Sequence, residues 1–469
     1  MSKLNSSFLD CIKKYKNKTA IILENNKKIS YQNLISNSEK ISKNLNDKKV
    51  LVFLLGHNNL ETLVGYISFV NKGFAVVLLD SKINQFLLDG LIDKYKPHYI
   101  FCEKIKKFNI KNYKVLLSFK SFNIYEEKKY SKIKIHKDLV LLMSTSGSTG
   151  SPKLVKLTYK NLESNTKNII KYLKIKKDDT SITSLPISYV YGLSVINTHL
   201  LSGGKIILTN RSMIEKEFWN LVNKFKVTSL SGVPYNYSII EKVFEKKIPK
   251  SLKYTTQAGG KMNYKLIRNL IRIFKKNKIK FIQMYGAAEA SARMTYLDWK
   301  YAKIKIGSIG KPIPSGKMYV IDSNKNKIKK KLKKGELVYE GKNVCMGYAN
   351  NYSDLALPDK NNGILYTGDI GYVDNDGFFF ITGRKNRYAK IYGIRVNLSE
   401  LETLLLTKGI ETIMKEAGEN KIYAYFKNAA EINKGLNFIL KITCLNKNVF
   451  INKIITKKNL TNNFKYKIA

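Results

Sequence analysis

Residues 50–102 read VLVFLLGHNNLETLVGYISFVNKGFAVVLLDSKINQFLLDGLIDKYKPHYIFC, and this segment alternates between two hydrophobic periods. Short, continuously apolar runs predict buried strands, and apolar residues at three- and four-residue spacing predict helices between them. The predicted strands and helices alternate, at residues 50–56, 59–73, 74–80, 83–96 and 98–102. Apolar strands joined by helices form a parallel sheet covered on both faces, and ligands bind such sheets at the carboxyl ends of the strands.

The rest of the chain extends this pattern and then departs from it. A second series of strands is expected to begin with DLVLLM at 138–143 and to continue at 205–210, 226–234 and 280–286. From about Ile306 short strands alternate with glycine turns, which is typical of β-rich structure. The predicted fold is α/β. It has a large N-terminal domain (1–383) of layered βαβ subdomains with a small β-rich subdomain (about 306–383), and a short α+β C-terminal domain (384–469).

The composition is strongly basic, but the basic residues are not clustered in one part of the sequence. In 469 residues, 84 Lys and Arg oppose 35 Asp and Glu, which gives a formal net charge of +49. Only seven of the basic residues are arginine, and the lysines are spread along the chain with abundant Asn, Ile and Tyr, as an AT-rich coding bias would produce. We interpret the charge as a solvated surface and expect no nucleic-acid partner. A non-catalytic polyanion-binding protein is the alternative from another functional class.

The spacing of the cysteines and the sequence of the N-terminus indicate the cellular compartment of the protein. Cys11, Cys102, Cys345 and Cys444 are far apart and form no CxxC pair, which argues against a zinc site or a disulfide framework. The first residues lack a long apolar region, and no uninterrupted apolar stretch reaches the roughly 18 residues of a membrane span. We therefore expect a cytoplasmic protein without a membrane span; the sequence does not indicate its oligomeric state.

The segment STSGSTGSPK, residues 144–153, directly follows a predicted buried strand. Its two glycines free the backbone amides to turn toward one point, and its six hydroxyl residues add donors around that point. Such a loop binds anions, and Lys153 at its exit adds a cation. It is not a Walker loop, because Pro152 stands where that motif requires glycine.

This loop resembles the phosphate-binding signature of the adenylate-forming superfamily, which contains acyl-CoA synthetases, peptide-synthetase adenylation domains and luciferases. Three further segments resemble that superfamily in the same order. MYGAAEA at 284–290 resembles YGxTE, LYTGDIGYVDNDGFFFITGR at 365–384 resembles the TGD and GR segments, and KIYGIRVNLSELE at 390–402 resembles KxxGxRVxxxEIE. The resemblance implies that ATP and a carboxylic acid form an acyl adenylate with loss of pyrophosphate, after which a thiol takes the acyl group.

The resemblance also implies roles for individual residues. Glu289 would hold Mg²⁺ beside the triphosphate, Tyr285 would lie against the adenine, and Asp369 and Arg384 would bind the ribose. Catalytic roles fall to Lys465, Glu289 and Thr149. The expected ATP-binding set is Thr145, Ser146, Gly147, Ser148, Thr149, Gly150, Lys153, Gly259, Tyr285, Gly286, Ala287, Asp369 and Arg384. The implied cofactors are ATP and Mg²⁺, with CoA or the phosphopantetheine of a carrier protein as co-substrate.

Near the C-terminus the resemblance is weaker. Lys465, in NLTNNFKYKIA, aligns with the lysine of PxTxxGK, although Phe464 replaces the glycine. The family's small domain swings about a hinge, here Asn386, and Gly393 matches the glycine beside the thiol tunnel. Ala288 replaces the threonine of YGxTE, which removes a hydroxyl near the phosphates. These departures leave an impaired second step, or a non-catalytic relative, as alternatives.

Two segments indicate the class of acid that the enzyme would activate, but not the acid itself. LPISYVYGLS at 185–194 resembles LPLFHVYGL, with Tyr189 where histidine is frequent, and Gly260 belongs to a matching glycine segment. Tyr189 and Gly260, with Gly393, form the expected acyl and thiol pocket. No Asp stands at 185–194 to pair with an α-ammonium group, which favours a fatty, hydroxy or aryl acid. The acceptor remains open between CoA, an acyl carrier protein, and an amine or hydroxyl.

Overall fold

The computed structural model describes residues 8–104, 112–129, 132–144, 153–262, 264–384, 388–406, 408, 410, 412–426 and 428–454. Contacts between the backbones divide the chain into two units, of which the larger ends at Gly383 and the smaller begins at Arg384. Each unit is described by itself. Among the described residues, no helix has both the length and the apolar character that crossing a bilayer requires.

The segment 50–102 forms the centre of the first sheet, as the sequence predicts. Three strands pair in parallel in the order β4-β3-β5, and two helices connect them. Their bounds are β3 Leu51–Gly56, α3 Leu60–Asn71, β4 Ala75–Asp80, α4 Gln85–Tyr95 and β5 Tyr99–Glu103. Each helix begins where an asparagine caps it: Asn59 accepts a hydrogen bond from the backbone N–H of Thr62, and Asn84 does the same for Leu87.

Strand β8 (Leu139–Ser144) corrects one expectation. The sequence pattern predicts that residues 138–143 begin a second series of strands, but β8 lies beside β4 in parallel and so belongs to the first sheet. A hydrophobic run does not encode which neighbour it pairs with, because every buried strand of a parallel sheet has the same pattern. The full order is β19-β9-β8-β4-β3-β5-β7-β6. The remaining strands are β6 Tyr113–Phe119, β7 Phe122–Glu127, β9 Leu154–Thr158 and β19 Tyr348–Ala349.

Both faces of this sheet are buried, which explains the continuously apolar strands. Val52 and Leu54 pack on one face with helices α1 (Phe8–Lys13), α2 (Tyr31–Lys43) and α3, whereas Phe53 and Leu55 face α4 on the other. Helix α6 (Val190–Leu201) also contributes Leu193, Ile196 and Leu200 to the first of these cores. The same helix presents Tyr191 to a core of the second sheet, so α6 lies between the two sheets.

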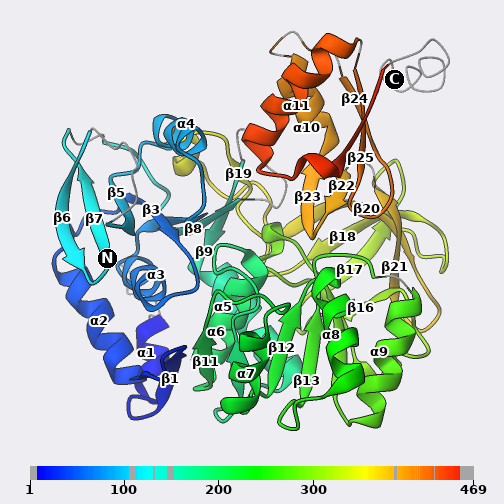
Figure 1. Ribbon diagram of the computed structural model, residues 1–469, viewed down its shortest axis with the longest axis horizontal. Helices are drawn as coiled ribbons and strands as arrows, with labels where there is room; N and C mark the ends of the chain where they lie inside the picture. Colours follow the sequence, from blue (N-terminus) through cyan, green and yellow to red (C-terminus); the bar gives the residue numbers. More distant parts are fainter. Residues whose placement is uncertain are drawn as a thin grey trace. The chain divides into compact units, whose positions relative to one another are not determined.

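The second sheet has a parallel core, β1-β11-β10-β12-β13-β14, with β2 antiparallel at its edge. Its strands are β1 Thr19–Leu23, β2 Lys28–Ser30, β10 Thr180–Ile182, β11 Lys205–Leu208, β12 Ser229–Gly232, β13 Tyr254–Gln257 and β14 Lys280–Tyr285. One face is covered by α7 (Lys216–Lys224), α8 (Pro234–Lys246) and α9 (Tyr264–Lys276), and α8 and α9 lie side by side (Figure 1). The other face packs against α5 (Tyr159–Leu173) and α6.

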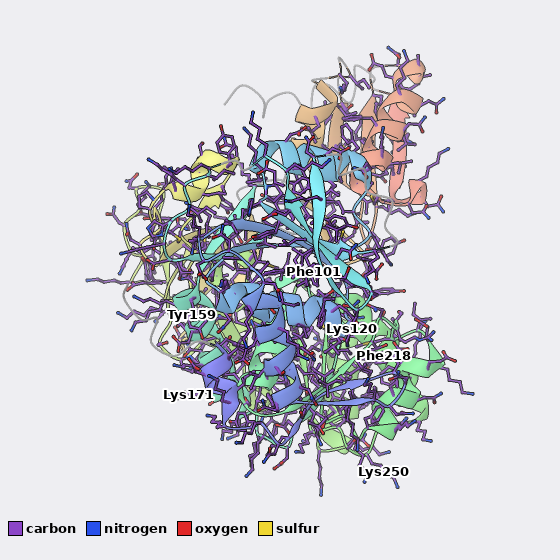
Figure 2. The ribbon with its side chains drawn as sticks, turned by 90° about the vertical axis from the view of Figure 1, so that its left-hand side faces the viewer. Phe101, Lys120, Tyr159, Lys171, Phe218 and Lys250 are labelled. Carbon is purple, nitrogen blue, oxygen red and sulfur yellow. The ribbon has the colours of Figure 1, made fainter. Side chains whose placement is uncertain are left out.

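The β-rich part predicted from about Ile306 is hydrogen-bonded to this sheet. Antiparallel pairing continues from β14 through β15 and β16 to β21, β20, β18 and β17, which makes one sheet of 13 strands. The bounds are β15 Thr295–Leu297, β16 Ser308–Pro312, β17 Lys317–Ile321, β18 Gly335–Glu340, β20 Ile364–Val373 and β21 Phe379–Arg384. Lys120, Lys171 and Lys250 are exposed on separate parts of the surface, as expected for lysines that are spread along the chain (Figure 2).

The smaller unit is an α+β structure with its own hydrophobic core. A hairpin and a three-stranded sheet in the order β24-β25-β26 pack with two helices around Leu401, Ile422, Phe426 and Ile439. The elements are β22 Tyr388–Ile391, β23 Ile394–Asn397, α10 Leu398–Leu406, β24 Thr412–Glu416, β25 Ile422–Phe426, α11 Ala429–Thr443 and β26 Phe450–Ile454.

Tyr31 joins the N-terminal segment to helix α6 and to the turn that leads from α6 into the second sheet. Its buried hydroxyl contacts the carbonyl oxygens of Leu200 at 3.1 Å and Gly204 at 2.7 Å. We predict that Tyr31→Phe lowers the free energy of unfolding by about 1–2 kcal/mol, because a buried carbonyl loses its donor. Urea denaturation measures the change. Tyr301→Phe, at a 41% exposed tyrosine, is the control and should have almost no effect; equal losses in both variants would contradict the prediction.

Candidate functional site

The end of β14 and the middle of β20 meet at Tyr285 and Asp369. The Tyr285 hydroxyl donates a short hydrogen bond to Oδ2 of Asp369, although the residues are 84 positions apart in the sequence. Asp369 is 1% exposed, and its backbone N–H donates to Oγ1 of Thr367 at 3.1 Å. The Tyr285 phenol and the Asp369 carboxylate, both predicted to bind the nucleotide, are therefore adjacent and held in place.

Directly after Tyr285 the backbone turns back on itself. At Gly286 a Cβ would lie 1.8 Å from the carbonyl oxygen of Ala292, so no side chain fits there without moving the backbone. The turn is closed by hydrogen bonds from the N–H of Met294 to the carbonyl of Tyr285 (2.9 Å) and from the N–H of Ala292 to the carbonyl of Ala287 (3.2 Å). Glycine is thus required by the close approach of two backbone segments.

This turn carries Glu289 on a short 3₁₀ helix, η1 (Ala288–Ala290). The half-buried Glu289 carboxylate accepts a hydrogen bond from the Tyr348 hydroxyl at 2.7 Å. The backbone carbonyl of Glu289 accepts another from the backbone N–H of Cys345 at 2.8 Å. Tyr348 belongs to β19, which pairs with β9 at Val155. Glu289 is therefore held next to the strand that follows the hydroxyl-rich segment.

The hydroxyl-rich segment itself lies mostly outside the described residues, which resume at Lys153. Its two flanking strands are described: β8 and β9 pair antiparallel, with Ser144 opposite Leu154, so the chain leaves and rejoins the sheet at one place. Lys153 is exposed at that place. Also outside the described residues are Thr145, Ser146, Gly147, Ser148, Thr149, Gly150, Asn386 and Lys465.

A metal ion at this site would have few protein ligands. Among the described residues, no group of three or more His, Cys, Asp and Glu could hold one. Mg²⁺ is commonly bound by one or two carboxylates, with substrate phosphates and water completing its shell. A single half-buried carboxylate, Glu289, beside the rejoining point of the hydroxyl-rich segment fits that mode of binding.

Tyr189 and Gly260, predicted for the acyl side, lie near Gly259, which is predicted for ATP binding and follows β13. Tyr189 immediately precedes α6, and Gly259 follows β13 with a φ of +82°. A Cβ at Gly259 would be 2.8 Å from the Tyr189 hydroxyl and 3.0 Å from Cγ1 of Val233, so Tyr189 closely approaches this backbone. The Gly260 carbonyl accepts a hydrogen bond from Nε2 of Gln257 at 2.8 Å.

Two predicted residues are described only through their backbone. Arg384 ends β21, and Gly393, in the smaller unit, has a φ of +86° at the turn between β22 and β23. No motif marks Tyr348, which contacts Glu289 from a distant segment. The buried Arg293 also lies outside every motif, and its only signal in the sequence is an arginine close to MYGAAEA in a lysine-rich chain.

The fold and the comparisons define the class of protein, the adenylate-forming enzymes. The sequence model of the family "AMP-binding enzyme" matches residues 8–349, and the chain belongs to that family. This confirms the predicted fold class and type of activity, the ATP-dependent activation of a carboxylic acid and its transfer to a thiol.

Two relatives and one solved structure illustrate the similarity. A 2-succinylbenzoate–CoA ligase from Bacillus pumilus is 26% identical over 405 residues, 85% of this chain and 81% of the relative. A D-alanine–D-alanyl carrier protein ligase from Staphylococcus epidermidis is 27% identical, over 81% of this chain and 78% of the relative. A Bacillus subtilis o-succinylbenzoate CoA synthetase, solved with a product analogue, has a TM-score of 0.78 at 21% identity and covers 96% of this chain and 95% of its own. The latter enzyme has also been solved with ATP and magnesium ion.

Gly286 provides a test of the turn that carries Glu289. We predict that Gly286→Ala lowers the free energy of unfolding by about 2 kcal/mol or more and weakens ATP binding, because the added methyl group displaces the Ala292 carbonyl. Gly90→Ala is the matched control: no atom lies within 4 Å of its added Cβ, and alanine favours helix α4. Thermal denaturation and nucleotide titration measure both effects; a Gly286→Ala protein as stable as the control would refute the close approach.

Proposed function

We propose that Tyr285, Asp369 and Glu289 form the nucleotide side of the adenylation site of this enzyme. The observation that carries the proposal is the hydrogen bond between Tyr285 and Asp369, together with Glu289 four residues beyond Tyr285. The Asp369 carboxylate can accept hydrogen bonds from ribose hydroxyls, and the Tyr285 ring offers an apolar face to a base. Arg384 and the hydroxyl-rich residues Thr145 to Gly150, with Lys153, would complete the contacts to sugar and phosphates.

The first half-reaction joins the acid to AMP. A carboxylate oxygen of the acid attacks the α-phosphorus of ATP, the bond to the bridging oxygen breaks, and pyrophosphate leaves with the electron pair. Most of the catalysis is neutralisation of charge and in-line positioning of the two reactants. Lys465 would supply the positive charge shared by the α-phosphate and the carboxylate, and Thr149 would donate a hydrogen bond to the phosphates. Glu289 would hold Mg²⁺, which supplies charge neutralisation at the phosphates when bound.

The second half-reaction transfers the acyl group to a thiol. The thiolate sulfur attacks the acyl carbon, the bond from that carbon to the phosphate oxygen breaks, and AMP leaves. Gly393, because it lacks a side chain, would let the thiol arm of CoA or of a carrier protein approach. Domain movement about Asn386, with a small domain of residues 384–469, would exchange Lys465 for Gly393 between the two steps.

The acid is proposed to lack an α-ammonium group. The carboxylic acids named in the relatives include both 2-succinylbenzoate and D-alanine. Residues 185–194 of this chain contain no Asp to pair with an ammonium group, and Tyr189 stands at the acyl side instead. A cytoplasmic location is part of the proposal, and it is supported by the four cysteines, all of which are free thiols.

Lys465 provides the sharpest test of the first half-reaction. We predict that Lys465→Ala lowers acid-dependent exchange of pyrophosphate into ATP by roughly 100-fold or more, because the charge at the α-phosphate is lost. Asp369→Ala and Glu289→Ala should weaken the exchange less completely, and Glu289→Ala should raise the Mg²⁺ concentration that is needed. Lys467→Ala removes a charge two residues away and should leave the exchange unchanged.

Two results would contradict this assignment. One is exchange by the Lys465→Ala protein at the rate of the Lys467→Ala control. The other is a wild-type protein that binds ATP but catalyses no exchange with any acid in a broad panel of fatty, hydroxy, aryl and dicarboxylic acids.

Gly393 separates the two half-reactions. We predict that Gly393→Leu lowers AMP release driven by CoA or carrier protein by roughly 10- to 100-fold while pyrophosphate exchange is kept, because the new side chain obstructs only the thiol. Gly418→Leu is the matched control, since this glycine of the same unit also has a positive φ, of +98°, and its surroundings are open. If both variants lose both half-reactions equally, the loss reflects backbone strain and the role of Gly393 is refuted.

A further inference from the structure

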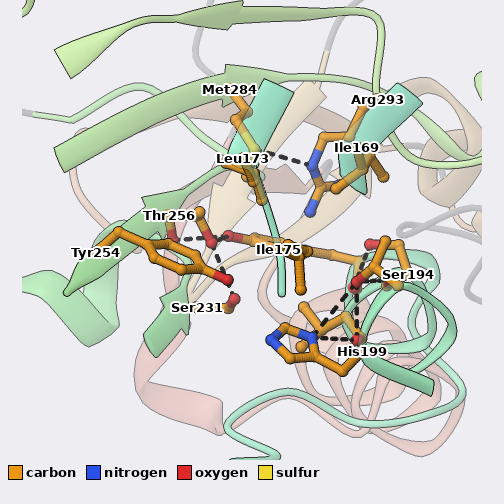
Figure 3. A pocket seen from close by; sticks show the side chains of 13 residues that line it. Ile169, Leu173, Ile175, Ser194, His199, Ser231, Tyr254, Thr256, Met284 and Arg293 are labelled. Carbon is orange, nitrogen blue, oxygen red and sulfur yellow. Dashed lines mark hydrogen bonds between the residues drawn. The ribbon is translucent and has the colours of Figure 1, made fainter. Parts of the chain in front are cut away.

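A buried arginine that no motif predicts faces a small cavity in the larger unit. Arg293 lies between η1 and β15 and is 3% exposed. The cavity lies between helices α5 and α6 and strands β12, β13 and β14, and Arg293 and His199 line it from opposite sides (Figure 3). Its volume available to the centres of water molecules is about 10 Å³, which is room for about one water.

The charge of Arg293 is not balanced by a carboxylate of the described chain. The ion pairs within 4.0 Å that involve a described arginine are those of Arg211 with Glu24 and Glu215. Arg293 instead donates from Nη1 to the carbonyl of Ala292 at 3.0 Å and from Nε to Sδ of Met284 at 3.4 Å. A guanidinium has five N–H donors, and a buried charge without an opposite charge is costly.

The other described residues that line the cavity are neutral. Burial lowers the pKa of His199, and its Nδ1 lies 2.8 Å from the carbonyl of Val195 and Nε2 3.3 Å from Oγ of Ser229, so the imidazole is uncharged at neutral pH. The Arg293 Cζ lies 3.8 Å from the centre of the Tyr191 ring, a cation–π contact that offsets part of the cost of burial. The Tyr254 side chain, which also lines the cavity, adds a buried hydroxyl group. The cavity thus combines one positive charge with hydrogen-bonding groups.

The cavity lies just below the acyl side of the proposed site. Ser231 and Thr256 line it and are paired neighbours on β12 and β13, with their hydroxyl oxygens 2.9 Å apart. Two residues further along these strands, on the same face, come Val233 and Ala258, beside Gly259. Two strand residues correspond to about 7 Å, so an acid that is activated beside Gly259 would have to extend by at least that length to reach the cavity.

We propose that Arg293 is a specificity residue that binds a second, non-reacting carboxylate of the acid substrate. This inference rests on the proposed adenylation of a carboxylic acid and names its class, the dicarboxylic acids. A carboxylate is the anion that a guanidinium pairs with most readily, here through one hydrogen-bonded oxygen. That oxygen can take the place of the one water that the cavity admits.

The experiment compares acids matched in length. Pyrophosphate exchange is measured with straight-chain diacids from succinate to suberate and with the monoacids of equal carbon number, on wild-type protein and on Arg293→Met. We expect kcat/KM for the best diacid to exceed that of its monoacid by roughly 10- to 100-fold, and Arg293→Met to remove this preference by lowering the diacid value alone. Arg268→Met, at an exposed arginine of α9, is the matched control and should keep the preference.

A second measurement does not depend on catalysis or on the variant. Diacids added to the wild-type protein without ATP should raise its melting temperature, whereas the matched monoacids should not. Wild-type exchange without preference for diacids, or an Arg293→Met protein that keeps the preference, overturns the role of Arg293 and leaves the proposed adenylation standing. Absence of exchange with every acid of the broad panel overturns the adenylation, and this inference with it.

Discussion

The hydrogen bond between Tyr285 and Asp369 requires the large sheet to curl. In the order β14-β15-β16-β21-β20, four strand spacings separate the two residues. At roughly 4.8 Å per spacing, a flat sheet would hold them about 19 Å apart. The antiparallel extension must therefore bend over the end of β14. Register shifts in the pairing of β16 with β21 and of β18 with β20 supply local irregularities of the kind that bend strands.

The turn after β14 is held by backbone contacts and by side-chain contacts, and these differ in how well they tolerate substitution. The turn after β14 depends on backbone geometry, because the contact between Gly286 and the Ala292 carbonyl leaves no space for a side chain. Within the same turn, Ala288 is buried and no backbone contact of the turn requires the hydroxyl that the family often has there. The position of Glu289 is instead maintained by its carbonyl and by Tyr348. The turn can therefore present a carboxylate without the threonine.

The sequence predicted where the helices and strands lie better than it predicted which strands pair with each other. Hydrophobic periods located β3, α3, β4, α4 and β5, because burial on two faces imposes a pattern that is visible in a short window. The same patterns did not place β8, since pairing in a parallel sheet depends on segments far apart. The residues proposed to bind the nucleotide were predicted from motifs, each of which is contiguous. Tyr348 and Arg293 were missed because their contacts with Glu289 and with the Tyr191 ring join segments that are far apart in the sequence.

The contrast between surface and buried cations explains how a strongly basic chain can still have a specific site. An exposed lysine keeps its hydration and costs little, so a net charge of +49 is a property of the surface and not of the fold. A buried ammonium group needs strong acceptors, and Lys156, which is 1% exposed, has them in the carbonyl oxygens of Asp354 and Leu357, each at 3.0 Å from Nζ. Arg293 is buried differently, with its Cζ 3.8 Å from the centre of the Tyr191 ring, and it donates to one carbonyl oxygen and to the weak acceptor Sδ of Met284. A planar, weakly hydrated guanidinium suits a place against an aromatic ring better than an ammonium group does, which accounts for an arginine at this position in a chain that otherwise uses lysine.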